Sequence, residues 1–303
     1  MLLEDVTDPQ IKSGEVLLKV CNAGICSSDI SRVYGHNAYH YPIILGHEFS
    51  GIVENVYDDC DKHWIGRNVG VFPLILCFKC ESCINGQYET CSNYSYIGSR
   101  QDGAFAEYVA VPVWNLIEIP KAINMELAAL LEPAAVALHA VKRADLKCVT
   151  SVAVFGRGII GRLISMWLNI YGIKDISLIG KDFVFSKNTD LCFEAVGKAS
   201  VFENCIETVR PNGQIILVGN PDYDFCLKRD LYWKILRKQL NIKGTWNSRF
   251  VDDWQETIEK IQNGELKFDE LITHRYSFKE LDKAVEMMHN NSEKRCKVII
   301  EYS

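Results

Sequence analysis

The chain has 303 residues, 48% of them hydrophobic, and this length is sufficient for two domains that each bury a core. Its formal net charge is −6 with both signs interspersed, which argues against a broad basic surface for nucleic acid or an anionic membrane. No run of about 18 apolar residues predicts a membrane span, and the first residues lack the pattern of a signal peptide. We therefore expect a cytoplasmic protein without nucleic-acid or membrane partners.

The first third of the chain is predicted to be rich in β-strands. Residues 15–20 and 49–56 alternate or run apolar over strand lengths, and glycine-containing joints separate them. Residues 74–103 have the composition of a loop and carry four cysteines. At residues 125–141 the apolar spacing becomes helical, which indicates that a different kind of domain follows.

Strands and helices alternate in the part that begins near residue 135. A β-branched run at residues 149–155 is typical of a strand buried on both faces. Further strands are expected at 176–179, 183–185, 191–195, 214–218 and 240–245, and helices at 160–171, 200–209 and 232–238. Such alternation predicts an α/β fold with a doubly wound parallel sheet covered by helices.

Four cysteines in the loop-like segment have the spacing of metal ligands. Cys77, Cys80, Cys83 and Cys91 follow a C-x2-C-x2-C-x7-C pattern. A set of four thiolates favours tetrahedral zinc with no open coordination position, which would be a structural site. Reduced thiols without metal and an iron–sulfur centre are the alternatives, although the spacing differs from the usual ferredoxin runs.

Potential ligands for a second metal are distributed over three segments. Cys26, His47 and a carboxylate from Glu132 or Glu48 would give the three mixed ligands that a catalytic zinc takes, with one position left for water or substrate. Taken singly, each residue is more often an ordinary core or surface side chain. Their combination is what predicts a catalytic zinc.

A glycine-rich segment after the strand at 149–155 predicts a dinucleotide site. Gly156, Gly158 and Gly161 form a G-x-G-x-x-G motif that opens an apolar helix. The acidic residue expected about twenty positions later, at the end of the next strand, is replaced by Gly180, and Lys181 follows it. The choice between NAD and NADP therefore stays open, because Lys181 could accept a 2′-phosphate.

The cofactor domain is shorter than a doubly wound sheet requires. The strand-like runs at 176–179, 183–185 and 191–195 follow one another too closely for parallel neighbours, whose crossovers need at least about 12 residues. We expect that two crossover helices are absent and that regular order is lost near residues 180–190. Missing residues, a true deletion or a local hairpin would each explain the gap.

Several motifs occur in the order found in one enzyme family. Cys26-x-Ser28-Asp29, the segment 46–51 (GHEFSG), the four cysteines, the segment 102–108 (DGAFAEY) and Glu132-Pro133 follow one another along the chain. The chain resembles the zinc-dependent medium-chain alcohol and polyol dehydrogenases. The resemblance implies a GroES-like catalytic domain at 1–134, a Rossmann domain at 135–268 and a return to the catalytic domain at 269–303.

The resemblance also implies roles for individual residues. Cys26, His47 and Glu132 would bind the catalytic zinc, with Glu48 as an alternating or water-bridged ligand. Ser28 would be the first proton acceptor and Asp29 would orient the imidazole of His47, although both residues could simply cap a turn. Contacts to NAD or NADP would come from the glycine-rich turn and the next strand, namely Gly156, Gly158, Ile159, Ile160, Gly161 and Lys181.

The implied reaction is oxidation of a secondary alcohol in a polyol or polyol phosphate, of the galactitol 1-phosphate type, to a ketone. Arg100, His40 and Lys297 are candidates for contacting a substrate phosphate. Threonine or short-chain alcohol dehydrogenation is an alternative, and so is a zinc-binding homologue that cannot seat the cofactor. Members of the family commonly form homodimers or homotetramers, and we expect the same here.

Overall fold

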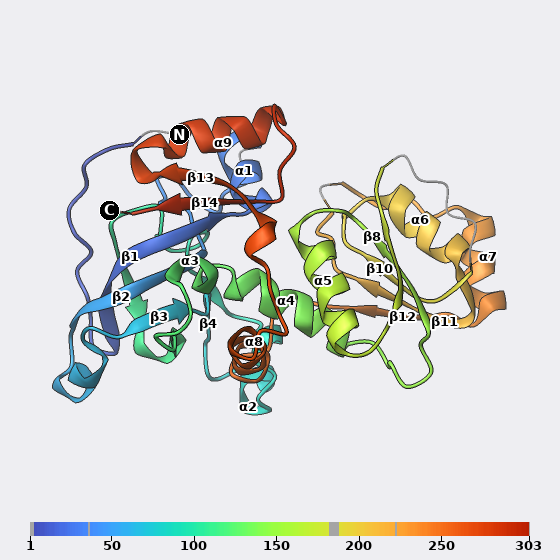
Figure 1. The fold of residues 1–303 in the computed structure, drawn as a ribbon, viewed down its shortest axis with the longest axis horizontal. Coiled ribbons are helices and arrows are strands. Elements are labelled where there is room, and N and C mark those ends of the chain that lie inside the picture. Colours follow the sequence, from blue (N-terminus) through green and yellow to red (C-terminus); the bar gives the residue numbers. More distant parts are fainter. Residues whose placement is uncertain (1–2, 36, 182–187, 222, 303) are drawn as a thin grey trace. The chain divides into compact units, whose positions relative to one another are not determined.

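The structure of the chain is a computed structural model that describes residues 3–35, 37–181, 188–221 and 223–302. The chain forms two compact units (Figure 1). One contains the residues up to Glu132 together with those from Phe250 onward, and the other contains Pro133–Arg249. No helix in the described ranges is long and apolar enough to cross a membrane.

The first unit is built on a seven-stranded sheet. Six strands follow the order β13-β14-β1-β2-β3-β7, and β6 pairs with the first part of β1. A separate pair, β4 and β5, belongs to the loop that carries the four cysteines. The strands are β1 (Glu15–Ile25), β2 (Glu48–Val56), β3 (Asn68–Val71), β4 (Leu74–Ile75), β5 (Ser95–Tyr96), β6 (Tyr108–Pro112), β7 (Leu116–Glu118), β13 (Ile272–Ser277) and β14 (Lys297–Glu301).

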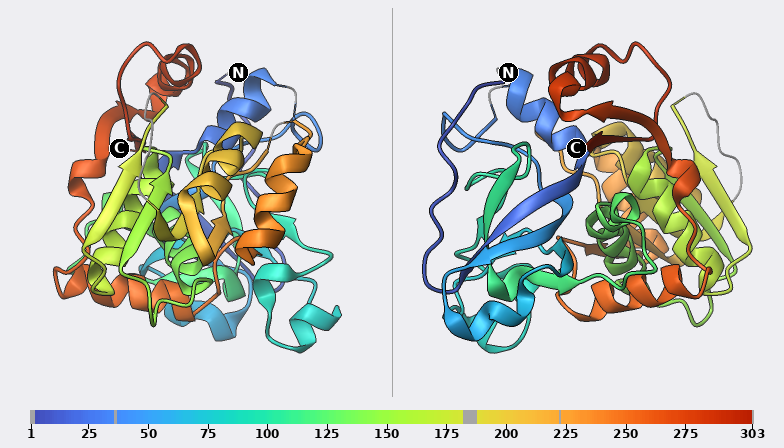
Figure 2. Two further views of the ribbon diagram at one scale, coloured as in Figure 1. Left: turned by 90° about the vertical axis from the view of Figure 1, so that its right-hand side faces the viewer. Right: turned by 60° about the vertical axis from the view of Figure 1, so that its left-hand side comes forward.

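Segments from both ends of the chain pair in this sheet. Strand β14 lies antiparallel to the second half of β1, as the adjacent red and blue arrows show in Figures 1 and 2. Helices α1 and α9 pack together, with the rings of Tyr34 and His289 stacked 3.7 Å apart. The helices are α1 (Ser27–Tyr34), α2 (Glu81–Ile84), α3 (Met125–Ala128), α8 (Asp252–Gln262) and α9 (Leu281–Asn290).

The chain returns to the first unit earlier than the sequence predicts. The expected boundary lay between residues 268 and 269, whereas the unit resumes at Phe250. Two aromatic contacts explain the difference, since Trp254 of α8 is only 1% exposed and meets Phe72 edge-on, and Phe250 lies 4.0 Å from the ring of Trp114. Burial of these rings fixes α8 in the first unit.

The predicted helix over residues 125–141 is two helices, α3 and α4 (Leu131–Lys142). Pro133 stands in the first turn of α4, where its missing N–H is tolerated, whereas the interior of one continuous helix would lose a hydrogen bond there. Glu132 is thereby placed at the start of a new helix. The units divide directly after Glu132.

The second unit contains a five-stranded parallel sheet in the order β12-β11-β10-β8-β9. Its strands are β8 (Ser151–Phe155), β9 (Asp175–Ile179), β10 (Thr189–Glu194), β11 (Val209–Leu217) and β12 (Asn241–Gly244). Helix α5 (Ile159–Ile170) connects β8 to β9 and lies on one face, while α6 (Ala199–Thr208) and α7 (Arg229–Lys238) lie on the other (Figure 1). This arrangement confirms the predicted Rossmann class.

The connection from β9 to β10 is the unusual part of this sheet. The two strands flank β8 on opposite sides, and both run parallel to it, which excludes the hairpin alternative for these strands. Of the nine residues between β9 and β10 the structure describes 180, 181 and 188, and none of these three is helical. The strand expected at 183–185 and the loss of regular order expected nearby concern residues 182–187, which lie outside the described ranges.

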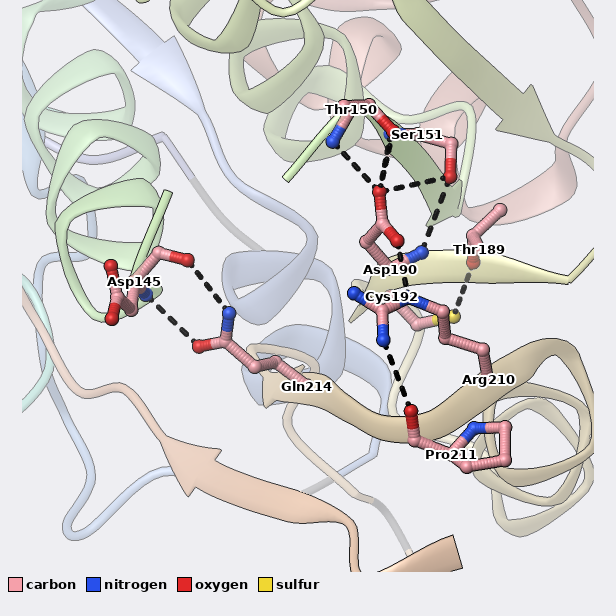
Figure 3. A network of polar contacts seen from close by, with 9 residues as sticks. All are labelled: Asp145, Thr150, Ser151, Thr189, Asp190, Cys192, Arg210, Pro211 and Gln214. Carbon is pink, nitrogen blue, oxygen red and sulfur yellow. Dashed lines mark hydrogen bonds and ion pairs between the residues drawn. The ribbon is translucent and has the colours of Figure 1, made fainter. Parts of the chain in front are cut away.

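A buried carboxylate joins three strands at the amino ends of β8 and β10 (Figure 3). Asp190 accepts hydrogen bonds from the backbone N–H groups of Thr150 and Ser151, at 2.7 and 2.9 Å, and from both hydroxyls. The guanidinium of Arg210, on β11, pairs with its other oxygen. Burial raises the pKa of Asp190, but the hydrogen bonds from Arg210, Thr150 and Ser151 outweigh it and hold the pKa well below its usual range.

We predict that Asp190→Asn lowers the free energy of unfolding by about 2 kcal/mol at pH 7, because a charge-assisted hydrogen bond is lost. The native pKa is depressed, so the stabilisation is present above the unfolded pKa of about 3.9 and is lost as pH falls toward the native value. Urea unfolding between pH 7 and pH 3 measures the difference. A difference in unfolding free energy between the wild type and Asp190→Asn that grows as pH falls would contradict this prediction. The exposed Asp145→Asn serves as control.

Candidate metal centres and cofactor site

The four cysteines of the loop form one cluster. Cys77, Cys80, Cys83 and Cys91 have sulfur atoms that all lie within 4.8 Å of one another. Individual Sγ–Sγ distances of 3.5 Å and 3.9 Å are close to the edge of about 3.8 Å in a tetrahedron with zinc–sulfur bonds of about 2.3 Å. All twelve cysteines of the chain are free thiols, so no disulfide competes for these sulfurs.

Local backbone geometry prepares this cluster for a cation. Backbone N–H groups of Cys83 and Ser92 donate to the Cys80 sulfur and lower the pKa of that thiol to about 5. Backbone hydrogen bonds, that of Lys79 first, also lower the pKa of Cys77. Thiolate is the form that ligates metal, so the loop favours the ligand state of Cys80 and Cys77. Burial and contacts with the neighbouring cysteines raise the pKa of Cys83 to about 12, so this thiol would lose its proton when a cation binds.

A second cluster lies where β1 ends and β2 begins. Cys26 follows the last residue of β1 and precedes α1, while His47 and Glu48 stand at the start of β2. One ligand atom from each of the three lies within 4.8 Å of the others, and His47 and Glu48 are buried. The pairing of Gly24 with Glu48 across β1 and β2 places the carboxylate beside Cys26.

A glycine in β1 makes room for the Glu48 carboxylate. A Cβ atom on Gly24 would lie 2.4 Å from Oε2 of Glu48, so any larger residue would displace the carboxylate. The same oxygen pairs with Nζ of Lys297, the first residue of β14, which also donates to the carbonyl of Ile25 at 3.2 Å. Lys297 is only 1% exposed. Its stem therefore crosses the core and its charge neutralises a buried acid.

The first turn of α1 contacts the imidazole of His47. Asp29 is fully buried, and its Oδ1 lies 3.3 Å from Nδ1 of His47, while Oδ2 accepts the backbone N–H of Cys26 at 3.0 Å. Burial lowers the pKa of His47, but the charge of Asp29 and the contacts with Asp29 and Cys26 raise it well above its usual value. This geometry turns Nε2 of His47 away from Asp29 and leaves it for a metal.

Ser28 is engaged by the same helix. Its hydroxyl oxygen accepts a hydrogen bond from the guanidinium of Arg32 at 2.7 Å. Arg32 also lies 3.7 Å from Asp29. A guanidinium has donors only, so Arg32 positions the hydroxyl but cannot take a proton from it.

Glu132, at the start of α4, lies near the second cluster without belonging to the three-residue set. The hydroxyl of Tyr96 donates to its carboxylate at 3.3 Å. Burial and the neighbouring charge of Glu48 raise the pKa of Glu132 to about 7. The ring of Tyr96 also meets His47 edge-on, at 5.8 Å between centroids. Tyr96 thus connects Glu132 to the residues at the start of β2.

The charges of this region fit a divalent cation. Asp29, Glu48, Glu132 and the thiol of Cys26 gather in a region where two carboxylates interact strongly enough to raise one pKa. Among the described residues, Glu132 has a tyrosine hydroxyl as its hydrogen-bond partner and no cation in an ion pair. Such a set of sulfur, imidazole and carboxylate donors suits zinc, and a bound cation would relieve the repulsion between the acids.

The glycine-rich turn of the second unit is shaped for close approach by a dinucleotide. A Cβ atom on Gly161 would lie 1.9 Å from the carbonyl of Gly156, so the turn can close only with glycine there. A Cβ on Gly158 would meet nothing within 4 Å, which leaves open space at the first turn of α5. Ile159 and Ile160 begin α5, and Lys181 is exposed just after β9. The turn therefore offers backbone N–H groups to a pyrophosphate.

Two of the three residues expected near a substrate phosphate are otherwise engaged. Lys297 is wrong for this role, because it is buried against Glu48. The guanidinium of Arg100 lies over the rings of Tyr39 and Tyr94, at 4.3 Å and 4.2 Å, and donates to the carbonyl of Tyr94. His40 is exposed and contacts the carbonyls of Pro42 and Arg100. Tyr96 has no motif of its own, and the sequence did not predict it at this site.

Comparison with known proteins identifies the family. Residues 12–121 match the alcohol dehydrogenase GroES-like domain, and residues 175–300 match the zinc-binding dehydrogenase domain. Galactitol 1-phosphate 5-dehydrogenase of Escherichia coli K12 is 32% identical over 318 residues, which cover 94% of this chain and 92% of that protein. The chain belongs to the zinc-dependent medium-chain dehydrogenases.

Solved structures agree with this assignment. Galactitol-1-phosphate dehydrogenase from Escherichia coli superposes with a TM-score of 0.85 at 30% identity, over 98% of this chain and 96% of that one. A short chain alcohol dehydrogenase from E. coli CFT073, solved with NADH, superposes with a TM-score of 0.89 at 26% identity, over 97% and 93%. The family is thus a zinc-binding one, with nicotinamide cofactor in a solved relative.

The alignment with galactitol 1-phosphate 5-dehydrogenase is longer than the part of the chain that it covers. It spans 318 positions, whereas 94% of this chain is about 285 residues, so at least about 33 positions have no residue here. The direct connection between β9 and β10 is where the expected crossovers are missing.

We predict that Lys297→Met lowers the free energy of unfolding by about 3–5 kcal/mol, because it leaves the Glu48 carboxylate buried without its cation. Urea unfolding of the metal-loaded protein measures this loss. The double variant Lys297→Met/Glu48→Gln removes both charges and should recover at least half of the loss. A single variant that loses less than about 1 kcal/mol would show that the pair does not stabilise this site.

Proposed function

We propose that this dehydrogenase oxidises a secondary alcohol of a polyol or polyol phosphate, similar to galactitol 1-phosphate, to a ketone, with hydride transfer to NAD or NADP. The observation that carries the proposal is the gathering of Cys26, His47 and Glu48 in one potential ligand set, with Glu132 close enough for its charge to interact with those of Glu48 and His47. Two glutamates thus accompany Cys26 and His47 in place of a second cysteine. The similarity to galactitol 1-phosphate 5-dehydrogenase supports the substrate class. The proposed assembly is a homodimer or homotetramer.

In this proposal Cys26, His47 and Glu132 bind the catalytic zinc, and Glu48 is the alternating ligand. A zinc ion there would act as a Lewis acid that lowers the pKa of the substrate hydroxyl. Lys297 holds Glu48 toward β14, and this contact favours Glu132 as the resident carboxylate. Cys77, Cys80, Cys83 and Cys91 bind the structural zinc.

The remaining residues of the site orient groups and move a proton. Asp29 holds the imidazole of His47 through Nδ1, so that Nε2 faces the metal. The hydroxyl of Ser28 accepts the proton of the substrate alcohol while it releases its own hydroxyl proton to water, and Arg32 keeps the serine oxygen in place. In the second unit the backbone of residues 156–161, including Ile159 and Ile160, binds the pyrophosphate, and Lys181 lies at the ribose end.

A substrate panel tests the reaction. We expect reduction of NAD or NADP with galactitol 1-phosphate or sorbitol, and little with threonine or ethanol, when product absorbance at 340 nm is followed. A preference for threonine or ethanol would replace the proposed substrate class. Absence of turnover together with absence of nucleotide binding would favour a zinc-binding protein that has lost the cofactor.

The metal assignment has its own test. We predict that Cys26→Ala retains about one zinc per chain, in the four-cysteine loop, and loses turnover by at least about a hundredfold. The control Cys60→Ala changes an exposed cysteine outside both clusters and should retain both zinc ions and the full rate. Atomic emission and steady-state rates provide the two measurements. A Cys26→Ala protein that keeps both zinc ions and its activity would overturn the assignment.

A further inference from the structure

The end of β9 lacks the side chain that usually binds the adenosine ribose in such a sheet. An aspartate or glutamate at this position accepts hydrogen bonds from the ribose hydroxyls of NAD and repels a 2′-phosphate. The residue here is Gly180, which offers neither an acceptor nor a negative charge. The position therefore places no electrostatic barrier against a phosphorylated ribose.

An arginine from the glycine-rich turn fills the space beside this glycine. A Cβ atom on Gly180 would lie 3.1 Å from Cδ and Nε of Arg157 and 3.4 Å from its Cζ. Nε of Arg157 donates to the carbonyl of Leu178 at 3.3 Å, which directs the guanidinium along the end of β9. Arg157 thus brings its charge to the place where the acidic residue would otherwise stand.

The backbone around Arg157 is fixed from two sides. The N–H of Gly156 donates to the carbonyl of Ile179 at 2.9 Å, which joins the turn to the last residue of β9. Nε of Arg162, in α5, donates to the carbonyl of Arg157 at 3.0 Å. The side chain of Arg157 is exposed, and none of the described residues forms an ion pair with it. Its terminal N–H groups are therefore available to a ligand.

We propose that the dinucleotide site prefers NADP over NAD, because Arg157, supported by Lys181, binds the 2′-phosphate beside Gly180. A phosphate monoester carries a charge of about −1.5 to −2 at neutral pH, and a guanidinium can bind two of its oxygens at once. Lys181 follows Gly180 directly and is exposed, so it adds a second cation at the same strand end. This inference rests on the proposed function only in using its cofactor site.

Binding of the two reduced cofactors to the free enzyme tests the preference without turnover. Quenching of tryptophan fluorescence gives the Kd of NADPH and of NADH for the wild-type protein. We expect NADPH to bind at least about tenfold more tightly, as one charge-assisted contact would provide. In Arg157→Gln the Kd of NADPH should rise about tenfold while the Kd of NADH changes less than about twofold.

Two further variants complete the experiment. Gly180→Asp adds the missing carboxylate next to Arg157, and it should reverse the preference in favour of NADH. Lys174→Gln removes an exposed cation just before β9, at the opposite end of the strand, and should change neither Kd.

The outcomes separate the inference from the proposed function. If the wild-type protein binds NADH as tightly as NADPH or more tightly, the inference is overturned. The proposed dehydrogenase function is not affected by that result. An equal rise in the Kd of NADPH and of NADH in Arg157→Gln would also overturn it. A residue that stacks on the adenine or shapes the turn contributes to the binding of both cofactors. If neither cofactor binds to the wild-type protein, the proposed function fails as well.

Discussion

The repulsion among buried acids is the constraint on which the catalytic unit depends. Glu48 and Glu132 come from two separate segments, and the fold holds them together beside Cys26 although like charges buried in a protein are costly. Lys297 from β14 neutralises Glu48. Burial and the charge of Glu48 raise the pKa of Glu132 to about 7. The site is therefore poised to accept a divalent cation, which explains why so much of the sheet serves to position it.

The surrounding fold follows from that requirement. The ligand residues stand at the end of β1 and at the starts of β2 and α4, and Gly24 gives the Glu48 carboxylate room that no larger residue would leave. Pairing of β14 with β1 brings the last part of the chain to the first, and Lys297 arrives with it. The separate loop with four cysteines has its own ligand set.

The local motifs could be recognised in the sequence because their residues are close together along the chain. Cys77 to Cys91 and the glycines of residues 156–161 could be read from spacing alone. Lys297 and Tyr96 could not, because they reach the site through strand pairing and belong to no motif. A lysine is usually exposed, so no pattern in the sequence predicted Lys297 in the core beside Glu48. The return of the chain at Phe250 was missed for a related reason, since single aromatic residues do not reveal which core they join.

The second unit shows how a Rossmann sheet can be shortened without losing its strand order around the glycine-rich turn. Strands β9 and β10 flank β8 as parallel neighbours, and Asp190 secures β10 and β11 to the start of β8 (Figure 3). The glycine-rich turn and the positive charges of Arg157 and Lys181 are present at the end of β9.

The central claim is that the chain holds two chemically different zinc sites. X-ray absorption of the zinc-loaded wild-type protein, together with its metal content, tests this most directly. The account predicts about two zinc ions per chain with an average of about 2.5 sulfur neighbours each and nitrogen or oxygen as the remainder. A single zinc per chain with four sulfur neighbours would contradict it, since the residues around Cys26 would then bind no metal.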